Sequence, residues 1–138
     1  MKQFKYRIYD TVYDDIVSEK KTIEFRLLND KSKDISKGDQ ILFIVENDDE
    51  KKVLVEVTNK YIYSDLDELW NSNDSLDNIL NYSRDEFINA FYDIFGKEVV
   101  NNSKIVGIEF KLKHWVGQEN NNYKIFNNKE IIWKDRWI

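Results

Sequence analysis

One short segment gathers most of the polar side chains that suit chemistry in this chain. Residues 20–27 read Lys-Lys-Thr-Ile-Glu-Phe-Arg-Leu. If they form a strand, alternate residues share a face at steps of about 7 Å, so that Thr22, Glu24 and Arg26 lie together. Arg presents a fork of donors to phosphate or carbonyl oxygens, and Glu accepts from an amino group. The pattern suits the binding of a planar ligand, but a surface strand with an ordinary Glu–Arg pair looks the same.

The rest of the chain offers few other routes to catalysis. Among 138 residues there is no Cys and one His, which excludes disulfides, thiolate zinc sites and multi-His metal sites. That residue, His114, stands near an expected strand end, where a surface or capping role suits it. No glycine-rich phosphate loop, zinc signature or nucleophile elbow is present. Acid–base chemistry must therefore use Lys, carboxylate or Tyr side chains, and neither a cofactor nor a metal is expected.

The distribution of charge along the chain is more informative than the net charge. The formal net charge of −5 disfavours a general binder of polyanions. Residues 1–26 sum to +1, residues 27–100 to −9 and residues 101–138 to +3. If the two basic ends lie side by side, one face can attract a few phosphates. The alternative is a solvated surface that keeps a small protein soluble.

Composition predicts one folded domain. The chain is 41% apolar and 14% aromatic, which is enough for a packed core. It has no Pro, only four Gly and no low-complexity linker. No apolar run approaches the roughly 20 residues of a membrane helix, and the first residues lack a signal-peptide core. We therefore expect a cytoplasmic protein with no membrane partner.

Apolar periodicity predicts the elements around the polar segment. Apolar residues at 4, 6 and 8 alternate with basic ones, which predicts a half-buried strand. A short helix should follow, opened by the weak capping pair Thr11 and Asp14 and ending near Lys20. Residues 21–28 predict a second strand, whose apolar residues face away from its polar ones. After a tight turn at Gly38-Asp39, two strands are expected at residues 40–46 and 53–63, with a hairpin tip at 47–50.

A longer helix is expected in the second half of the chain. Ser83 with Glu86 forms the best capping box in the sequence, and Gly96 stands where a helix C-cap is expected. Between them, phenylalanines at 87, 91 and 95 form an apolar stripe at helical spacing. A partner groove would use such a stripe, but packing in the core is the favoured interpretation.

The chain closes with a strand and an aromatic tail. Ile105–Leu112 predicts a strand, in which Gly107 marks a bulge or a close backbone approach. Segments 123–126 and 131–133 flank Asn127-Asn128, which suits a hairpin turn. Basic residues interleave with the aromatic residues of the tail. These aromatic residues could stack on bases, be buried over one end of a barrel or form a homodimer contact. Burial is favoured because exposed Trp lowers solubility. The aromatic residues are Trp115, Tyr123, Phe126, Trp133 and Trp137.

This order of elements predicts an α+β fold. Most connections are too short for a βαβ crossover. A small, mixed and mostly antiparallel β-sheet or barrel with flanking helices is therefore favoured.

Two motifs in the chain resemble the ASCH family of the PUA-like superfamily. The first is Lys21-Thr22-Ile23-Glu24-Phe25-Arg26-Leu27, and the second is Lys37-Gly38-Asp39-Gln40-Ile41-Leu42-Phe43. The family pattern continues with a Val-x-Val strand, here Val53, Val55 and Val57, and Ile105–Phe110 resembles its closing strand. The resemblance marks residues 1–113 as an ASCH-like domain. It leaves residues 114–138 as a C-terminal aromatic extension, expected to pack as a β-hairpin on the same domain.

The resemblance implies a small PUA-like β-barrel with helices at its side. It also implies a cleft beside the Lys-Thr-x-Glu-x-Arg strand, where RNA or a nucleotide would bind. The positions that carry over as ligand-binding residues are Lys21, Thr22, Glu24 and Arg26. Where the family usually has Gly before this motif, the chain has Glu19, so a less tight turn is expected.

Some ASCH-like proteins hydrolyse N4-acetylcytidine, and a small amidohydrolase is therefore the alternative function. In that subgroup the motif reads Lys-Thr-x-Thr-x-Arg, with the second Thr as nucleophile. This chain has Lys21 in register but Glu24 in the nucleophile position. A carboxylate cannot repeat the chemistry of a Thr alkoxide, although a desolvated Lys21 would still serve as a base. The distant glutamate of the subgroup has no assigned counterpart in this sequence, and Asp74 or Asp77 would be guesses.

Overall fold

The computed structural model describes residues 1–73, 83–119 and 122–123. A five-stranded sheet has the order β1-β3-β4-β5-β2, and β6 and β7 form a separate small sheet. The chain divides into two compact units, which are described separately. Unit 1 consists of residues 1–23, 35–60 and 108–138, and unit 2 of residues 24–34 and 61–107. The predicted α+β class with a mixed sheet is confirmed.

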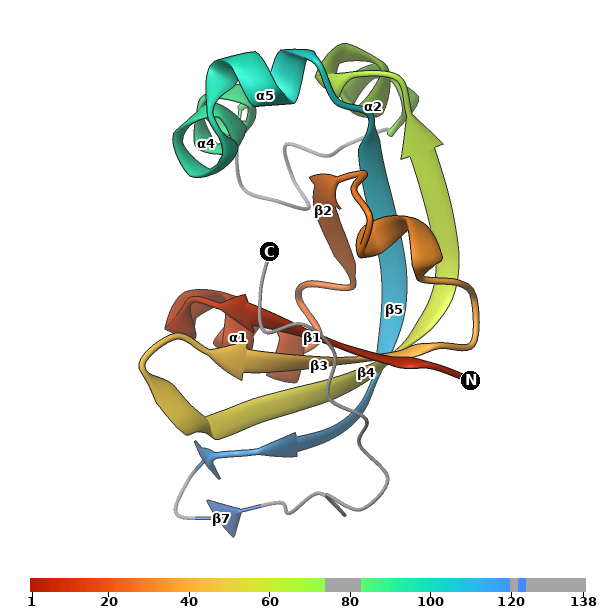
Figure 1. Cartoon of the computed structure of the whole chain (residues 1–138). Coiled ribbons are helices and arrows are strands. Elements are labelled where there is room, and N and C mark those ends of the chain that lie inside the picture. The colour runs from red at the N-terminus through yellow and green to blue at the C-terminus, as the bar shows by residue number, and fades with distance from the viewer. Residues whose placement is uncertain (74–82, 120–121, 124–138) are drawn as a thin grey trace. The chain divides into compact units, whose positions relative to one another are not determined.

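The sheet of unit 1 begins with three neighbouring strands (Figure 1). Strand β1 (Gln3–Ile8) runs parallel to β3 (Gln40–Val45), which runs antiparallel to β4 (Asp48–Tyr63). The predicted hairpin tip is shorter than expected, since β4 already starts at Asp48. Asn47 turns the chain in the left-handed region, at φ 65°.

Strand β1 is buried on both faces, so the prediction of a half-buried strand is wrong. Tyr6 is 1% exposed and lies near Phe43, with ring centroids 6.3 Å apart. On the other face Lys5 is 9% exposed, and it pairs in register with Leu42. A second apolar cluster explains this burial, because both sides of the unit 1 sheet carry apolar residues. The cluster consists of Leu42, Ile44 and Leu54, with Val116 packed against it.

Helix α1 (Asp10–Val17) starts earlier than predicted, so the Thr11–Asp14 cap is wrong. The N-cap is Tyr9, and it makes no side-chain capping hydrogen bond. The amides of Val12 and Tyr13 instead donate to the Tyr9 carbonyl at 3.0 and 3.1 Å. Because β1 extends to Ile8, the chain enters the helix directly from the strand. Backbone bonds therefore close the first turn.

The turn predicted at Gly38-Asp39 is confirmed, and it holds β1 and β3 together at their starts. Gly38 has φ 93°, a left-handed conformation that suits glycine. The Asp39 carboxylate is almost fully buried and accepts from the amides of Lys2 at 2.9 Å and Ser36 at 2.8 Å. Asp39 is thus a structural residue in this turn.

Strands β2 (Ile23–Leu27) and β5 (Ile105–Val116) are neighbours in the sheet. The close approach predicted at Gly107 is confirmed: a Cβ there would lie 3.0 Å from the Phe25 ring and 3.3 Å from that of Tyr63. Strand β5 runs beyond the predicted end at Leu112, so residue 113, the expected domain boundary, lies inside it.

The tail begins with a short antiparallel pair, β6 (Gln118–Glu119) and β7 (Asn122–Tyr123). The other strand segments predicted for the tail lie outside the described residues. That the tail packs on the domain as a hairpin stays a prediction.

The helices of unit 2 are α2 (Leu66–Ser72), α4 (Arg84–Phe95) and α5 (Lys97–Asn101). The capping box of Ser83 and Glu86 at α4 is confirmed, and Gly96 ends the helix at φ 89°. Helix α5 was not expected, because it has five residues and no side-chain cap to mark its start.

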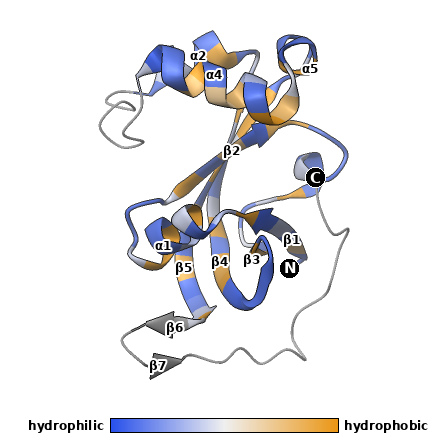
Figure 2. Ribbon diagram, turned by 90° about the vertical axis from the view of Figure 1, so that its left-hand side faces the viewer, coloured by the Kyte–Doolittle hydropathy of each residue, from blue (hydrophilic) through white to orange (hydrophobic). Residues whose placement is uncertain are grey.

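The aromatic stripe of α4 packs inward, as predicted. The Phe87 ring centroid lies 5.9 Å from that of Phe25, 5.6 Å from that of Trp70 and 5.2 Å from that of Phe91. Figure 2 shows the same division by hydropathy, with apolar colour along one side of α4 and hydrophilic colour along the other. The face of β2 that carries Phe25 is thereby held in the core of unit 2.

The capping box predicts a dependence of stability on pH. Hydrogen bonds from the Ser83 amide and hydroxyl lower the pKa of Glu86 below its ordinary value. A lowered folded-state pKa contributes stability above the unfolded-state pKa, and this is lost as the pH falls through the folded-state value. We expect Glu86→Gln to reduce the loss of stability between about pH 5 and pH 3, because glutamine keeps the cap but does not titrate.

Urea unfolding at a series of pH values measures this effect. Glu98→Gln is the control, because Glu98 is an exposed glutamate in the first turn of α5. Equal pH profiles for wild type and Glu86→Gln would contradict the prediction.

Candidate functional site

Strand β2 separates its polar and apolar side chains as its alternation predicts. Phe25 and Leu27 are buried, at 6% and 8% exposure. Glu24 and Arg26 project from the opposite face, and Glu24 Oε2 lies 3.8 Å from Arg26 Nη2. The two side chains are only 13% and 11% exposed, respectively. The two residues thus form the Glu–Arg pair of the alternative interpretation, but with lower exposure than an ordinary surface pair has.

The geometry of this ion pair differs from that of a tight salt bridge. A charge-assisted N–H···O bond is typically about 2.7–2.9 Å long, so a 3.8 Å separation is an ion pair and not a tight fork on the carboxylate. Water screens charges weakly at such low exposure. A cationic donor and an anionic acceptor thus stand one alternation step apart on the same face of β2. A planar molecule with both an acceptor and a donor on one edge is the chemical complement of this pair.

Lys21 and Thr22 lie just before β2, in the turn after α1. The Lys21 amide donates to the Asp15 carbonyl at 3.0 Å, which ties this turn to the last part of the helix. The Thr22 carbonyl accepts from the Phe110 amide at 2.9 Å, so its backbone is held to β5. The Lys21 side chain is half-buried and Thr22 is exposed. Within unit 1 these backbone bonds fix where both residues leave the helix.

The turn at Glu19 is as tight as glycine would allow, and the prediction of a looser turn is wrong. Glu19 adopts φ 63°, in the left-handed region. Its amide donates to the Ile16 carbonyl at 3.0 Å. The helix end and the start of β2 impose this conformation whatever the side chain, and a left-handed residue other than glycine costs about 1–2 kcal/mol. The tertiary structure therefore tolerates local strain directly before the polar motif.

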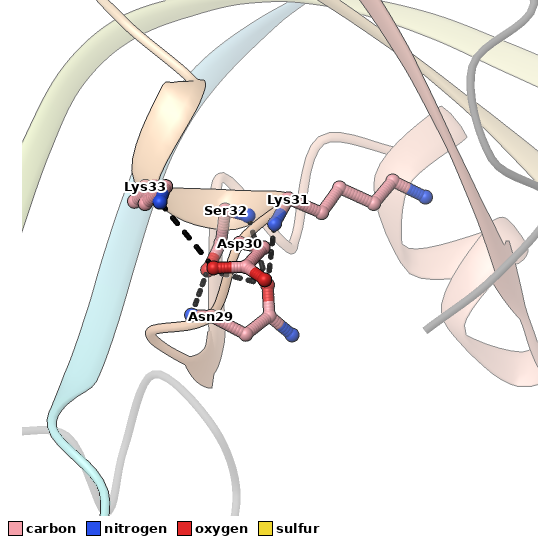
Figure 3. A network of polar contacts seen from close by, with 5 residues as sticks. All are labelled: Asn29, Asp30, Lys31, Ser32 and Lys33. Atoms are coloured by element: carbon pink, nitrogen blue, oxygen red, sulfur yellow. Dashed lines mark hydrogen bonds and ion pairs between the residues drawn. The ribbon is translucent and has the colours of Figure 1, made fainter.

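A loop network that sequence reasoning missed secures the end of β2 (Figure 3). The buried Ser32 hydroxyl accepts from the Asn29 amide and donates to the Leu27 carbonyl, both at 2.9 Å. Asn29 Oδ1 accepts from the amides of Ser32 at 2.9 Å and Lys31 at 3.0 Å. In Figure 3 the Lys31 side chain points away from this network. The signal in the sequence was the Asn-x-x-Ser spacing, since both side chains often cap backbone groups.

Other candidates contribute less to this site. His114 is exposed on β5, which agrees with the expected surface role. Asp74 and Asp77 lie outside the described residues. Within the described ranges, no three His, Cys, Asp or Glu side chains gather as metal ligands. In that same part of the chain, no helix is both long and apolar enough to cross a membrane.

The two units differ in charge. Unit 2 contains twelve acidic and six basic residues, whereas unit 1 contains fourteen acidic and fifteen basic residues. The acidic excess of the protein therefore belongs to the unit that carries α2, α4 and α5. Polyanions are repelled from unit 2, so phosphate contacts are more favourable on unit 1.

Comparison with known proteins identifies the fold. No family model matches the chain, and no curated protein matches its sequence. The crystal structure of hypothetical protein PH0355 is 24% identical, with a TM-score of 0.67 over 80% of this chain and 99% of that one. The solution structure of protein PF0455 from Pyrococcus furiosus is 23% identical, with a TM-score of 0.60 over 80% and 96%. The crystal structure of ASCH from Zymomonas mobilis is 17% identical, with a TM-score of 0.51 over 80% and 67%.

These similarities show that the chain has the same mixed α+β fold as these solved structures. One of them is the Zymomonas mobilis ASCH structure, whose fold the chain therefore shares. The ASCH resemblance carried by residues 21–27 and 37–43 is thereby confirmed at the level of fold. The roles of Lys21, Thr22, Glu24 and Arg26 remain predictions.

The strained turn predicts that Glu19→Gly stabilises the protein. Relief of the left-handed conformation outweighs the extra freedom that glycine gives the unfolded chain, for a net gain of about 0.5–1 kcal/mol. Urea unfolding at pH 7 measures the difference. Glu19→Ala is the matched control, because it removes the same charge but keeps the Cβ. If alanine stabilises as much as glycine, the gain comes from charge and not from backbone conformation.

Proposed function

We propose that the protein is a binding module for nucleotides or short single-stranded RNA, and that it uses the segment Lys21–Arg26. One observation carries the proposal. Glu24 and Arg26 are 3.8 Å apart on one face of β2 and are largely withdrawn from water. The likeness to ASCH structures supports the same segment, because the motif that carries the sequence resemblance is the one that forms this pair.

The chemistry of the pair favours a base that carries an amino group. The Watson–Crick edges of cytosine and adenine place an exocyclic N–H₂ donor beside a ring-nitrogen acceptor. The Glu24 carboxylate accepts from the amino group while the Arg26 guanidinium donates to the neighbouring acceptor. Uracil has no amino group, and the N3 imide is the one donor on its edge, so it offers the recessed carboxylate a single N–H where an amino group offers two. An unmet buried acceptor costs about 1–3 kcal/mol. Cytidine should therefore bind better than uridine.

The charge of the protein limits how many phosphate groups of a ligand it can contact. The net charge is −5, and the small basic excess of unit 1 supports only a few phosphate contacts. Lys21 stands three residues before Glu24 in the sequence. Affinity should fall with salt concentration in proportion to the number of phosphates neutralised. A shallow slope, of about one or two phosphates, is expected.

The amidohydrolase alternative is less favoured by the same residues. The position of the nucleophilic Thr in the related motif is occupied by Glu24, which is already paired with Arg26. A carboxylate paired with a guanidinium is a weak nucleophile. Binding without turnover is therefore the function that we propose for this segment.

Calorimetric titration with cytidine and uridine monophosphates, at several salt concentrations, tests the proposal. We expect saturable binding of the cytidine nucleotide. Arg26→Lys should weaken it about tenfold or more, because Lys keeps the charge but loses the planar fork. Lys33→Ala is the control, since Lys33 is an exposed lysine in the loop after β2. If neither nucleotide binds saturably, or Arg26→Lys has no effect, the proposal is wrong.

Incubation with N4-acetylcytidine distinguishes binding from hydrolysis. We expect no release of acetate by the wild-type protein, because Glu24 stands in place of the nucleophile. Glu24→Thr restores the Lys-Thr-x-Thr-x-Arg pattern and is the variant in which slow turnover should appear. Acetate release by the wild type that is abolished by Lys21→Ala would replace the binding proposal with the hydrolase.

A further inference from the structure

Helix α1 is attached to the strands of unit 1 by a set of contacts outside the polar motif. Lys51, on β4, donates from Nζ to Asp10 Oδ1 at 2.7 Å. The same Nζ lies 5.1 Å from the centroid of the Tyr13 ring, within the range of a cation–π interaction. One lysine thus contacts both the first residue of the helix and the residue one turn later.

Tyr13 extends this attachment to β5. Its side chain is 4% exposed, and its hydroxyl donates to the Val116 carbonyl at 3.0 Å. Gly117 directly follows, and a Cβ at this residue would stand 2.3 Å from the Tyr13 oxygen. The absence of a side chain at Gly117 is therefore needed for the hydroxyl to reach β5. We call Asp10, Tyr13, Lys51 and Gly117 the α1 clamp.

The far end of the same helix holds the backbone of the polar motif. The Lys21 amide donates to the Asp15 carbonyl at 3.0 Å, and the Ser18 amide donates to the Asp14 carbonyl at 3.0 Å. Helix α1 has eight residues and is therefore about 12 Å long, so it moves as a rigid rod. A tilt at the clamped end is transmitted to the turn that carries Lys21.

We propose that the α1 clamp is a positioning device for the Lys21–Thr22 turn. Its residues do not contact the ligand, and they act by fixing the helix from which the turn departs. The expected effect of the clamp on ligand affinity rests on the proposed function. The expected effect of the clamp on the backbone at Lys21 does not depend on that function and is tested separately.

The electrostatics of Lys51 agree with this role. The hydrogen bond to Asp10 raises the pKa of Lys51 above its ordinary value, with smaller contributions from the charges of Asp10, Asp14 and Asp48. A raised folded-state pKa contributes stability below the unfolded-state pKa of lysine, and this is lost as the pH rises through the folded-state value. The lysine is therefore charged throughout the neutral range, where it contacts Asp10 and Tyr13.

Amide hydrogen exchange and calorimetry together test the proposal. Tyr13→Phe removes the bond to Val116 but keeps the ring under Lys51. We expect exchange of the Lys21 and Ser18 amides to accelerate about fivefold, which corresponds to one hydrogen bond. Exchange at Phe87 in α4 should be unchanged. Lys51→Met should act in the same direction, and Lys51→Arg should restore slow exchange because it can still contact Asp10 and the Tyr13 ring.

A control variant and a measurement of nucleotide affinity complete the test of the α1 clamp. Tyr9→Phe removes a hydroxyl from an exposed tyrosine beside the same helix and should change nothing. Cytidine monophosphate should bind Tyr13→Phe at least threefold more weakly than wild type. Equal acceleration of exchange at Lys21 and Phe87 would mean general destabilisation and would overturn the clamp. Failure of the wild type to bind the nucleotide would overturn the proposed function, while the exchange result would still decide the structural part of the clamp.

Discussion

The low exposure of the Glu24–Arg26 pair is the physical constraint on which the proposed function depends. Moving an ion out of water costs several kcal/mol, and the partner charge recovers this only in good geometry. At 3.8 Å the two groups form an ion pair and not a tight salt bridge. The arrangement is maintained because the opposite face of β2 is anchored by Phe25, which packs on Gly107 and Phe87. A slip of one residue would exchange the two faces and bury the charges in that aromatic core.

One fold commonly supports more than one chemistry, and under the proposed function Glu24 is the residue that favours binding over hydrolysis. A threonine in place of Glu24 would provide a nucleophile, whereas the carboxylate present provides an acceptor beside Arg26. The acidic surface of unit 2 also argues against a general binder of RNA, because long polyanions are repelled there. Under the proposed function, the recessed pair would bind one nucleotide or a short single strand, and its selectivity would come from the base edge more than from the phosphates.

Features governed by neighbours in the chain were predictable. The Ser83–Glu86 capping box, the Gly96 cap and the Gly38-Asp39 turn follow from local hydrogen bonds and backbone conformation, and all three are present. Features governed by distant segments were not. The burial of Lys5 depends on apolar residues on both sides of the unit 1 sheet, and the first turn of α1 needs no side-chain cap because β1 leads straight into it.

From its sequence alone, the chain determined the strand that carries Glu24 and Arg26, and the alternation that separates these two residues from Phe25. The resemblance to ASCH domains also follows from the sequence alone. The strand alternation and the motif resemblance both depend only on residue types and their spacing. Tertiary structure alone decided that the Glu24–Arg26 pair is recessed and that Glu19 takes a left-handed conformation. The physical reason is that solvent exposure and imposed backbone geometry are set by segments far away in the chain. Such segments leave no mark on the local pattern of residues.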